Sequence, residues 1–304
     1  MISKAVVEAL TKYASEENVF LLEPLSAHTT FRVGGPADCL IEIQGTEQLC
    51  KIQSYLTKVG VPFFVLGNGS NLLVSDDGYR GVILKVGNHM NKVSVTGNRL
   101  TVGAGARLTQ VAKLAAKQGL SGLEFAAGIP GTVGGGVVMN AGAYGGEMSQ
   151  VVSRVTVVNK EGELLELDNE TMEFGYRKST IKNQSFIVTE VAFDLQQKAG
   201  DEIFAKMEDF NQRRREKQPL EYPSAGSTFK RPEGYFAGEL IMKAGLRGFR
   251  LGGAQVSEKH CGFVINKGNA TAADIMKVIC HVQECVYERF QVRLEPEVIF
   301  LGTF

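Results

Sequence analysis

Residues 38–76, DCLIEIQGTEQLCKIQSYLTKVGVPFFVLGNGSNLLVSD, contain the pattern that decides the fold. The segments DCLIEI (38–43) and PFFVLG (62–67) are short, apolar and flanked by glycine, which is typical of buried strands. Between them, apolar residues recur at helical spacing from Thr46, where we expect a helix cap, to Gly60, which ends the helix. A strand, a helix and a strand in this order predict a parallel βαβ unit.

Antiparallel pairing is expected further along the chain. VILKV (82–86) continues the buried strands, whereas the alternating runs in 92–102 and 154–167 predict hairpins. A charged helix is predicted at 201–218, after a break near Gln196–Gly200. We therefore expect an α+β fold in three closely packed units. The predicted units are residues 1–86, 87–199 and 200–304.

The last predicted helix, 271–290, has the clearest signals at its start and along its face. Apolar residues from Ile275 to Phe290 recur on one side, and Thr271 with Asp274 forms a variant of the capping box. We expect this helix to pack on the core of the third unit.

Composition excludes several classes of protein. Lys+Arg and Asp+Glu both number 33 in 304 residues, so the basic excess of a nucleic-acid binder is missing. The sequence has no apolar run of about 18 residues and no secretory signal, and we expect a cytoplasmic protein that does not enter a membrane. Five cysteines without a CxxC pair argue against a disulfide framework and a zinc site, so no metal is expected.

Glycine is in excess, with 35 residues, and gathers in two segments, VLGNGSNLLVSD (65–76) and residues 128–147. Backbone without Cβ atoms can bring N–H groups against phosphate oxygens. Leu72 stands where a dinucleotide fingerprint needs its third glycine, and no Gly-Lys pair provides a Walker A loop. The glycines indicate a pyrophosphate held in another fold; the alternative is that they only make tight turns.

Several motifs together resemble one known family. They are TTFRVGGPAD (29–38), LGNGSNLLVSD (66–76), GIPGTVGGGVVMNAGAYGGE (128–147), FGYRKST (174–180), EYPSAGSTFKRP (221–232), AGELIMKAGLRG (237–248) and LEPEV (294–298). In this order they resemble the UDP-N-acetylenolpyruvoylglucosamine reductases, in the shorter type that lacks an inserted tyrosine loop. The resemblance implies an FAD-binding fold of the vanillyl-alcohol oxidase and p-cresol methylhydroxylase type in two subdomains, with a C-terminal α/β substrate-binding domain.

The resemblance also implies an activity. Non-covalent FAD, reduced by NADPH, would reduce the enolpyruvyl ether of UDP-N-acetyl-3-O-(1-carboxyvinyl)-glucosamine to UDP-N-acetylmuramate during peptidoglycan synthesis. The expected partner is this UDP-sugar, with no nucleic acid and no membrane, and we expect a monomer. An FAD-dependent oxidase of the same fold, using oxygen, is the alternative enzyme, and a nucleotide-binding module without catalysis is a third hypothesis.

Three residues are implied to carry the chemistry. Arg177 would bind the substrate carboxylate, because a guanidinium matches its two oxygens. Ser227 would deliver the proton, and Glu297 would assist at the enolate stage. Ser224 and Glu295 lie in the same motifs and are the competing assignments.

The remaining implied residues bind the cofactor or the substrate. For FAD they are Arg32, Gly67, Asn68, Gly69, Ser70, Asn71, Gly128, Pro130, Gly131, Gly134, Asn140 and Gly142. For the substrate they are Tyr144, Arg214 and Lys217, although the last two could also be the solvated end of a charged helix. His28 lacks the sequence context of a covalent flavin attachment.

Overall fold

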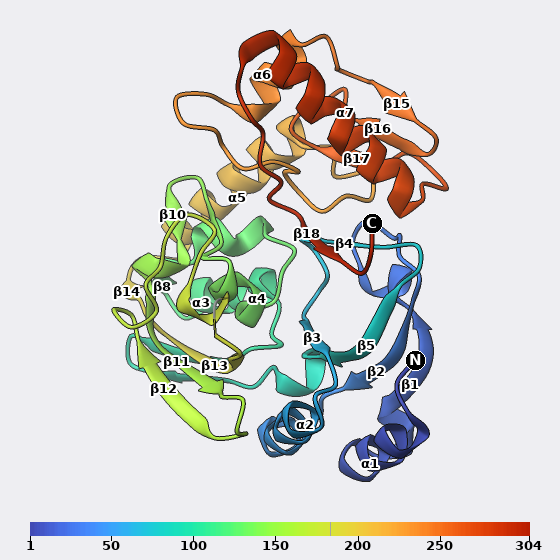
Figure 1. Cartoon of the computed structure of the whole chain (residues 1–304). Helices are drawn as coiled ribbons and strands as arrows, with labels where there is room; N and C mark the ends of the chain where they lie inside the picture. The colour runs from blue at the N-terminus through green and yellow to red at the C-terminus, as the bar shows by residue number, and fades with distance from the viewer. Residues whose placement is uncertain (183) are drawn as a thin grey trace. The chain divides into compact units, whose positions relative to one another are not determined.

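The computed structural model describes residues 1–182 and 184–304, and Figure 1 labels its main elements. Its α-helices are α1 (Lys4–Ala14), α2 (Thr46–Val59), α3 (Leu108–Lys117), α4 (Val133–Val138), α5 (Gly200–Lys217), α6 (Ala237–Lys243) and α7 (Ala272–Phe290). Its first strands are β1 (Val19–Pro24), β2 (Pro36–Glu42), β3 (Phe63–Leu66), β4 (Leu72–Val74), β5 (Tyr79–Lys85), β6 (Val93–Thr96), β7 (Arg99–Gly103), β8 (Leu120–Ser121) and β9 (Gly142–Ala143). Its later strands are β10 (Gly146–Glu147), β11 (Val152–Val158), β12 (Leu164–Asp168), β13 (Ile187–Asp194), β14 (Gln196–Gln197), β15 (Arg250–Leu251), β16 (Ala254–Val256), β17 (Val264–Asn266) and β18 (Ile299–Leu301). The predicted α+β class is confirmed.

Residue contacts divide the described chain into two compact units. The first unit contains residues 1–21, 39–68 and 81–214, and the second contains 22–38, 69–80 and 215–304. The chain therefore changes unit inside β1, β2, β5 and α5. This division differs from the three consecutive ranges predicted from the sequence, because two early segments cluster with the C-terminal part.

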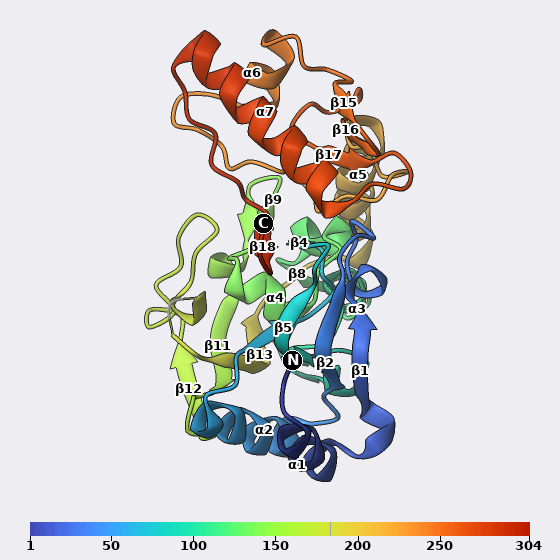
Figure 2. The same ribbon diagram turned by 45° about the vertical axis from the view of Figure 1, so that its right-hand side comes forward.

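The strand, helix and strand of the predicted βαβ unit are present as β2, α2 and β3, but β5 lies between the two strands in a sheet of order β1-β2-β5-β3. β3 and β5 pair in parallel, from Phe63 opposite Val82 to Leu66 opposite Lys85. Helix α2 lies before β3 and packs against α1, as Figure 2 shows. The predicted cap at Thr46 is wrong by one residue. Gly45 holds the cap position, and the Gln44 amide is satisfied by the Gln48 side chain at 2.8 Å.

A five-stranded antiparallel sheet forms the other part of the first unit, in the order β12-β11-β13-β7-β6. Both predicted hairpins are confirmed: Thr96 pairs with Arg99 at the β6–β7 turn, and Val158 pairs with Leu164 in β11–β12. The buried core of this unit is continuous from α1 to α5 and includes side chains from α2, α3 and both sheets.

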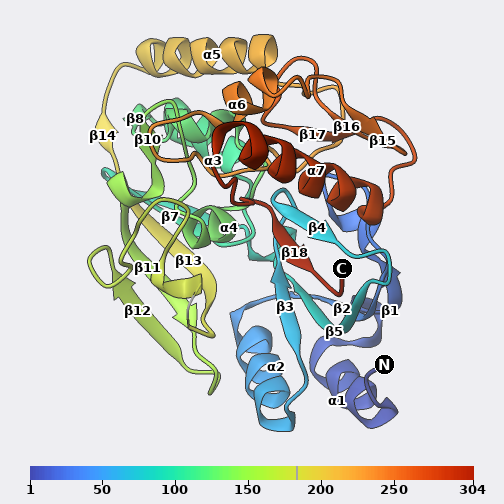
Figure 3. The same ribbon diagram turned by 45° about the horizontal axis from the view of Figure 1, so that its top comes forward.

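The second unit is built around α7 and the antiparallel sheet β15-β16-β17. The predicted capping box is present, since Asp274 N–H donates to Thr271 Oγ1 at 3.0 Å and Thr271 N–H donates to the Asp274 carboxylate at 3.3 Å. Asp76, from the first glycine segment, adds two further bonds by accepting from the Ala272 and Ala273 amides at 2.8 and 2.9 Å. The same segment also contributes β4, which pairs in parallel with β18 (Figure 3).

Candidate active site

A pocket of about 160 Å³ lies in the first unit, where strands β2, β3, β5 and β7 end. Ligands commonly bind at the carboxyl ends of parallel strands, and whole ligand sites measure about 300–1,000 Å³, so this pocket has room for one portion of a dinucleotide. Its lining residues are Glu42, Ile43, Gly67, Asn68, Lys85, Gly87, Asn88, His89, Gly105, Arg107 and Thr132.

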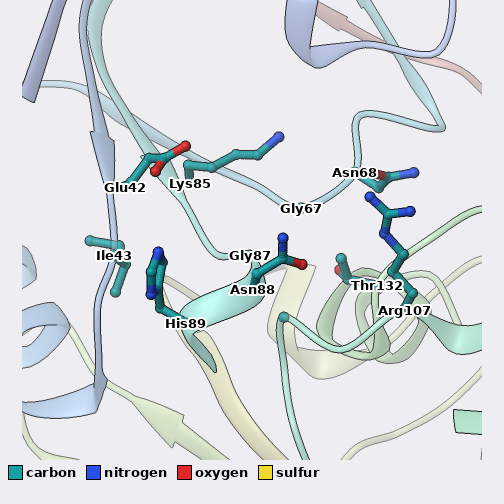
Figure 4. Close-up of a pocket in the computed structure, with 11 residues that line it drawn as sticks. Glu42, Ile43, Gly67, Asn68, Lys85, Gly87, Asn88, His89, Arg107 and Thr132 are labelled. Carbon is teal, nitrogen blue, oxygen red and sulfur yellow. The ribbon is translucent and has the colours of Figure 1, made fainter. Parts of the chain in front are cut away.

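Two cations and one carboxylate give the pocket its charge. Figure 4 shows Glu42 and Lys85 on one side of it, and Arg107 with Thr132 on the other. Burial lowers the pKa of Lys85, the Glu42 carboxylate opposes this, and the Arg107 cation lowers the pKa further. An anion in the pocket would relieve the repulsion between the cations, so a diphosphate matches this site.

The two glycine segments meet at this pocket. A Cβ atom on Gly67 would lie 2.5 Å from Thr132 Oγ1, and the Asn68 amide donates to the Pro130 carbonyl. On the pocket wall, a Cβ on Gly105 would lie 1.9 Å from the Gly87 carbonyl oxygen. The two cations, together with the polar side chains of Asn68 and Thr132 on the pocket wall, fit the diphosphate of the FAD that the resemblance implies.

Other glycines of the second segment serve protein packing. Gly134 donates its N–H to the Ala104 carbonyl at 2.8 Å, and a Cβ on Gly134 would come within 2.9 Å of the Ala104 Cβ. Gly142 pairs with Glu147 in β9–β10, and the Gly131 carbonyl accepts from the Leu108 amide at 3.1 Å. The density of glycine here thus partly reflects close contact between backbones.

Arg32 and residues 69–71 belong to the second unit, whereas Gly67 and Asn68 belong to the first. A Cβ on Gly69 would lie 2.1 Å from the His28 carbonyl oxygen, and Arg32 is exposed in the left-handed region with φ 57°. The Asn71 amide donates to the Glu297 carbonyl at 3.1 Å. Asn71 therefore supports the segment that contains a predicted catalytic residue.

The His28 ring is engaged by a neighbouring carboxylate. Its Nε2 lies 2.8 Å from Glu23 Oε1, and both side chains are largely buried. The pairing orients the imidazole toward Glu23.

Ser227 and Glu297 lie on two adjacent segments of the second unit. Phe229 forms an antiparallel bridge with Pro296, and Glu297 N–H donates to the Thr228 carbonyl at 2.8 Å. Ser227 is exposed and follows Gly226, whose φ is 77°. Residues seventy positions apart in the sequence are thus held within one short backbone pairing.

The competing residues of the same motifs have other contacts. The Glu295 carboxylate forms a 3.0 Å ion pair with Lys230 on the surface. The Ser224 carbonyl accepts from Thr30 Oγ1 at 2.6 Å. The ion pair engages the Glu295 carboxylate, whereas the Ser224 bond uses its backbone carbonyl and does not distinguish the hydroxyls of Ser224 and Ser227.

Arg177 is half-buried in the first unit, in a tight turn between Gly175 and Lys178. Its guanidinium carbon lies 5.1 Å from the centre of the Tyr176 ring. Its φ of 56° is in the left-handed region, which non-glycine residues seldom adopt. The predicted FAD ligand Asn140 also has a positive φ and donates to the Gly175 carbonyl at 3.1 Å.

Tyr144 stacks on Phe210 of α5, with ring centres 4.6 Å apart and planes inclined by 11°. One turn further along α5, Arg214 lies against Gly128, where a Cβ would come within 2.5 Å of Arg214 Nη1. Burial lowers the pKa of Arg214, and Tyr144 partly offsets this effect. Lys217 is exposed on the same helix but clusters with the second unit.

Sequence reasoning missed Lys85, Arg107 and Phe210. Lys85 carries a usable signal, because it interrupts the apolar run of 82–86 at the carboxyl end of a predicted strand. Arg107 directly precedes α3, and no feature of the surrounding sequence distinguishes it from other surface arginines. Phe210 lies in a helix that reads as charged, and only its stacking on Tyr144 distinguishes it.

Comparison with known proteins adds two family matches. The model of an FAD binding domain matches residues 37–168, and the model of the UDP-N-acetylenolpyruvoylglucosamine reductase C-terminal domain matches residues 218–301. A UDP-N-acetylenolpyruvoylglucosamine reductase of Caldanaerobacter subterraneus is 48% identical over 301 residues, covering 99% of both chains. The corresponding protein of Clostridium botulinum is 51% identical over 285 residues, covering 94% of this chain and 93% of its own length.

Solved structures agree with these matches. The UDP-N-acetylenolpyruvylglucosamine reductase of Thermus caldophilus superposes with a TM-score of 0.81 at 37% identity, covering 93% of this chain and 98% of its own. An alkyldihydroxyacetonephosphate synthase gives a TM-score of 0.50 at 17% identity, covering 65% of this chain and 41% of its own, which indicates a shared fold alone. The predicted flavoprotein fold is confirmed.

Neither membrane spans nor metal clusters emerge from the described ranges. No helix within 1–182 or 184–304 combines the length and apolar character needed to cross a bilayer. The same residues contain no group of three or more His, Cys, Asp or Glu side chains placed to hold a metal ion.

Proposed function

The chain belongs to the UDP-N-acetylenolpyruvoylglucosamine reductase family, and from this membership we propose which of its residues carry out the reaction. It is an FAD-dependent oxidoreductase of peptidoglycan synthesis that acts on a UDP-sugar. The observation that carries the proposal is the pocket where Lys85 and Arg107 face backbone from both glycine segments.

FAD would be held non-covalently, with its diphosphate at Lys85 and Arg107 and against the backbone of Gly67, Asn68 and Thr132. The charge of the two cations on opposite sides of the pocket supports this assignment. When bound, FAD supplies from N5 the hydride that the enolpyruvyl double bond accepts, and NADPH is the proposed reductant that renews it.

Arg177 binds the carboxylate of the enolpyruvyl group. Negative charge builds on that carboxylate as the double bond is reduced. A bidentate guanidinium therefore stabilises the transition state more strongly than the starting substrate. Removal of one such donor commonly costs about 2.7–4 kcal/mol of transition-state stabilisation. The left-handed backbone at Arg177 supports a functional role, because such conformations concentrate at active sites.

Ser227 Oγ delivers a proton to the carbon next to the one that receives hydride. Its exposure and the absence of bulk at Gly226 leave the hydroxyl accessible to a substrate. Glu297 assists at the enolate stage, and its backbone pairing beside Ser227 supports joint action. The competing residue Glu295 forms a surface ion pair with Lys230.

Arg214 and Lys217 are proposed to bind the diphosphate of the substrate, with Tyr144 lining the site. The packing of Tyr144 on Phe210 and the burial of Arg214 argue against a merely solvated helix end. We keep as proposals that ranges 1–86 and 87–199 bind FAD while 200–304 bind substrate, and that the protein is a cytoplasmic monomer that binds neither nucleic acid nor membranes.

A two-step spectroscopic experiment tests this function. The purified protein should be yellow, lose its flavin colour with NADPH under anaerobic conditions, and regain it when the enolpyruvyl nucleotide is added. An oxidase of the same fold would not be bleached by NADPH. A colourless protein that takes up no added FAD would refute the cofactor assignment.

A further inference from the structure

The turn that carries Arg177 is held in an unusual backbone conformation. Gly175 and Lys178 exchange both backbone hydrogen bonds, at 3.0 and 3.1 Å, so Tyr176 and Arg177 are the two central residues of a hairpin turn. Arg177 occupies the second central position with φ 56°, where glycine or asparagine is the usual residue. An arginine retains this geometry only where the surroundings enforce it.

Asn140 provides the first restraint on this turn. Its side chain is buried, with 1% of the residue exposed, and its Nδ2 donates to the Gly175 carbonyl at 3.1 Å. Its Oδ1 accepts from the Ser149 amide at 2.9 Å, which fixes the orientation of the carboxamide. The Gly175 carbonyl thus receives one bond from within the turn and one from Asn140.

Ser179 provides the second restraint, at the other end of the turn. It is fully buried, and its hydroxyl donates to the Val138 carbonyl at 2.9 Å. Val138 is the last residue of α4 and lies two positions before Asn140. One short segment, 138–140, therefore holds both sides of the turn.

We propose that Asn140 is a positioning residue for Arg177, which acts by fixing the Gly175–Lys178 turn together with Ser179. The inference rests on the proposed role of Arg177 in binding the substrate carboxylate. It assigns the Asn140 side chain to protein backbone, in place of the direct contact with FAD that was predicted from the sequence. A displacement of about 1 Å in a substrate-orienting group can reduce rate about a hundredfold, so the turn matters although Asn140 touches no reacting atom.

Asn140→Asp is the main test, because it preserves side-chain volume and the acceptor for Ser149 but places a carboxylate oxygen against the Gly175 carbonyl. We expect kcat/KM for the enolpyruvyl nucleotide to fall about tenfold to a hundredfold. FAD content and the rate of bleaching by NADPH should stay at the wild-type level. Asn159→Asp is the matched control, since Asn159 is a buried asparagine of the same unit that orders the distant turn 159–163. It should lower stability without changing kcat/KM.

Non-additivity provides the second measurement. If Asn140 acts through Arg177, adding Asn140→Asp to Arg177→Ala should cause little further loss of kcat/KM, whereas independent effects would multiply. If Asn140→Asp prevents folding, Ser179→Ala takes its place in the comparison of single and double variants with Arg177→Ala. Ser179→Thr is then the conservative variant that retains the hydroxyl.

Four results would overturn the inference. Multiplicative effects in the double variant would show that Asn140 acts independently of Arg177. An unchanged kcat/KM in a folded Asn140→Asp protein would show that Asn140 has no positioning role. Loss of FAD from Asn140→Asp with normal turnover in the refilled enzyme would return Asn140 to direct cofactor binding. Full activity of Arg177→Ala alone would instead refute the proposed function of Arg177, and the positioning role with it.

Discussion

Asp76→Ala is expected to weaken the start of α7 by about 1–2 kcal/mol. The substitution removes the acceptor for the amides of Ala272 and Ala273, which lie 2.8 and 2.9 Å from the two carboxylate oxygens. Losing a helix cap costs about 0.5–2 kcal/mol, and losing a negative charge at a helix N-terminus costs about 0.3–1 kcal/mol. Asp76 is exposed, so water molecules can bond the two amides in the variant and offset part of the lost free energy. The combined cost of the lost cap and the lost charge should therefore stay near the middle of these ranges.

Hydrogen exchange measures this effect where it arises. A loss of about 1–2 kcal/mol lowers the protection of amides in the first turns of α7 about 5–30-fold. Asp76→Asn retains one acceptor oxygen and should give a smaller change. Asp77→Ala is the control, because it removes the neighbouring exposed carboxylate while leaving Asp76 in place.

Equal loss of protection in Asp76→Ala and Asp77→Ala would show that general surface charge, rather than capping, stabilises α7. An unchanged exchange rate in Asp76→Ala would show that the Thr271–Asp274 capping box satisfies this helix end without help.

Other sites give further expected outcomes. Lys85→Met should weaken FAD affinity about tenfold, measured by flavin fluorescence, because a cation is removed from the proposed diphosphate site; Arg107→Lys should weaken it less. Burial alone would raise the pKa of Glu124, but hydrogen bonds from Ser121 and Gly122 outweigh it and hold that pKa below its ordinary value. The ionised Glu124 carboxylate therefore contributes its full stabilisation above the unfolded-state pKa of about 4.3, and this is lost as the pH falls through its lower pKa in the folded protein. In urea unfolding, Glu124→Gln should therefore make the free energy of unfolding depend less steeply on pH in the acid range. Ser227→Ala should still be bleached by NADPH, but should fail to regain colour with the enolpyruvyl nucleotide; recovery at the wild-type rate would exclude Ser227 as the proton donor.

Local patterns in the sequence predicted the regular elements well. Helix α7 begins at its capping box and buries its predicted apolar residues from Ile275 to Val286, because capping and helical periodicity are properties of neighbouring residues. The hairpin around Gly97 is found for the same reason. Such signals need no information about the remainder of the chain.

Long-range relations were beyond this kind of reasoning. The sequence offers no local sign that Asp76 accepts from amides 196 and 197 positions further along. Likewise, no local pattern predicts the ion pair of Glu295 with Lys230, which lies 65 positions earlier. The role of Asn140 depends on Gly175, which lies 35 positions away.

The parallel pairing of β4 with β18 has a consequence for synthesis of the protein on the ribosome. The Ser75 hydroxyl donates to the Thr303 carbonyl, and these residues are 228 positions apart. At about 5–20 residues per second, β4 waits roughly 10–50 seconds after it emerges before its partner strand exists. During that interval Leu72, Leu73 and Val74, all buried in the finished protein, form an open apolar edge that other chains could join. The nascent chain therefore exposes this edge until β18 has been synthesised.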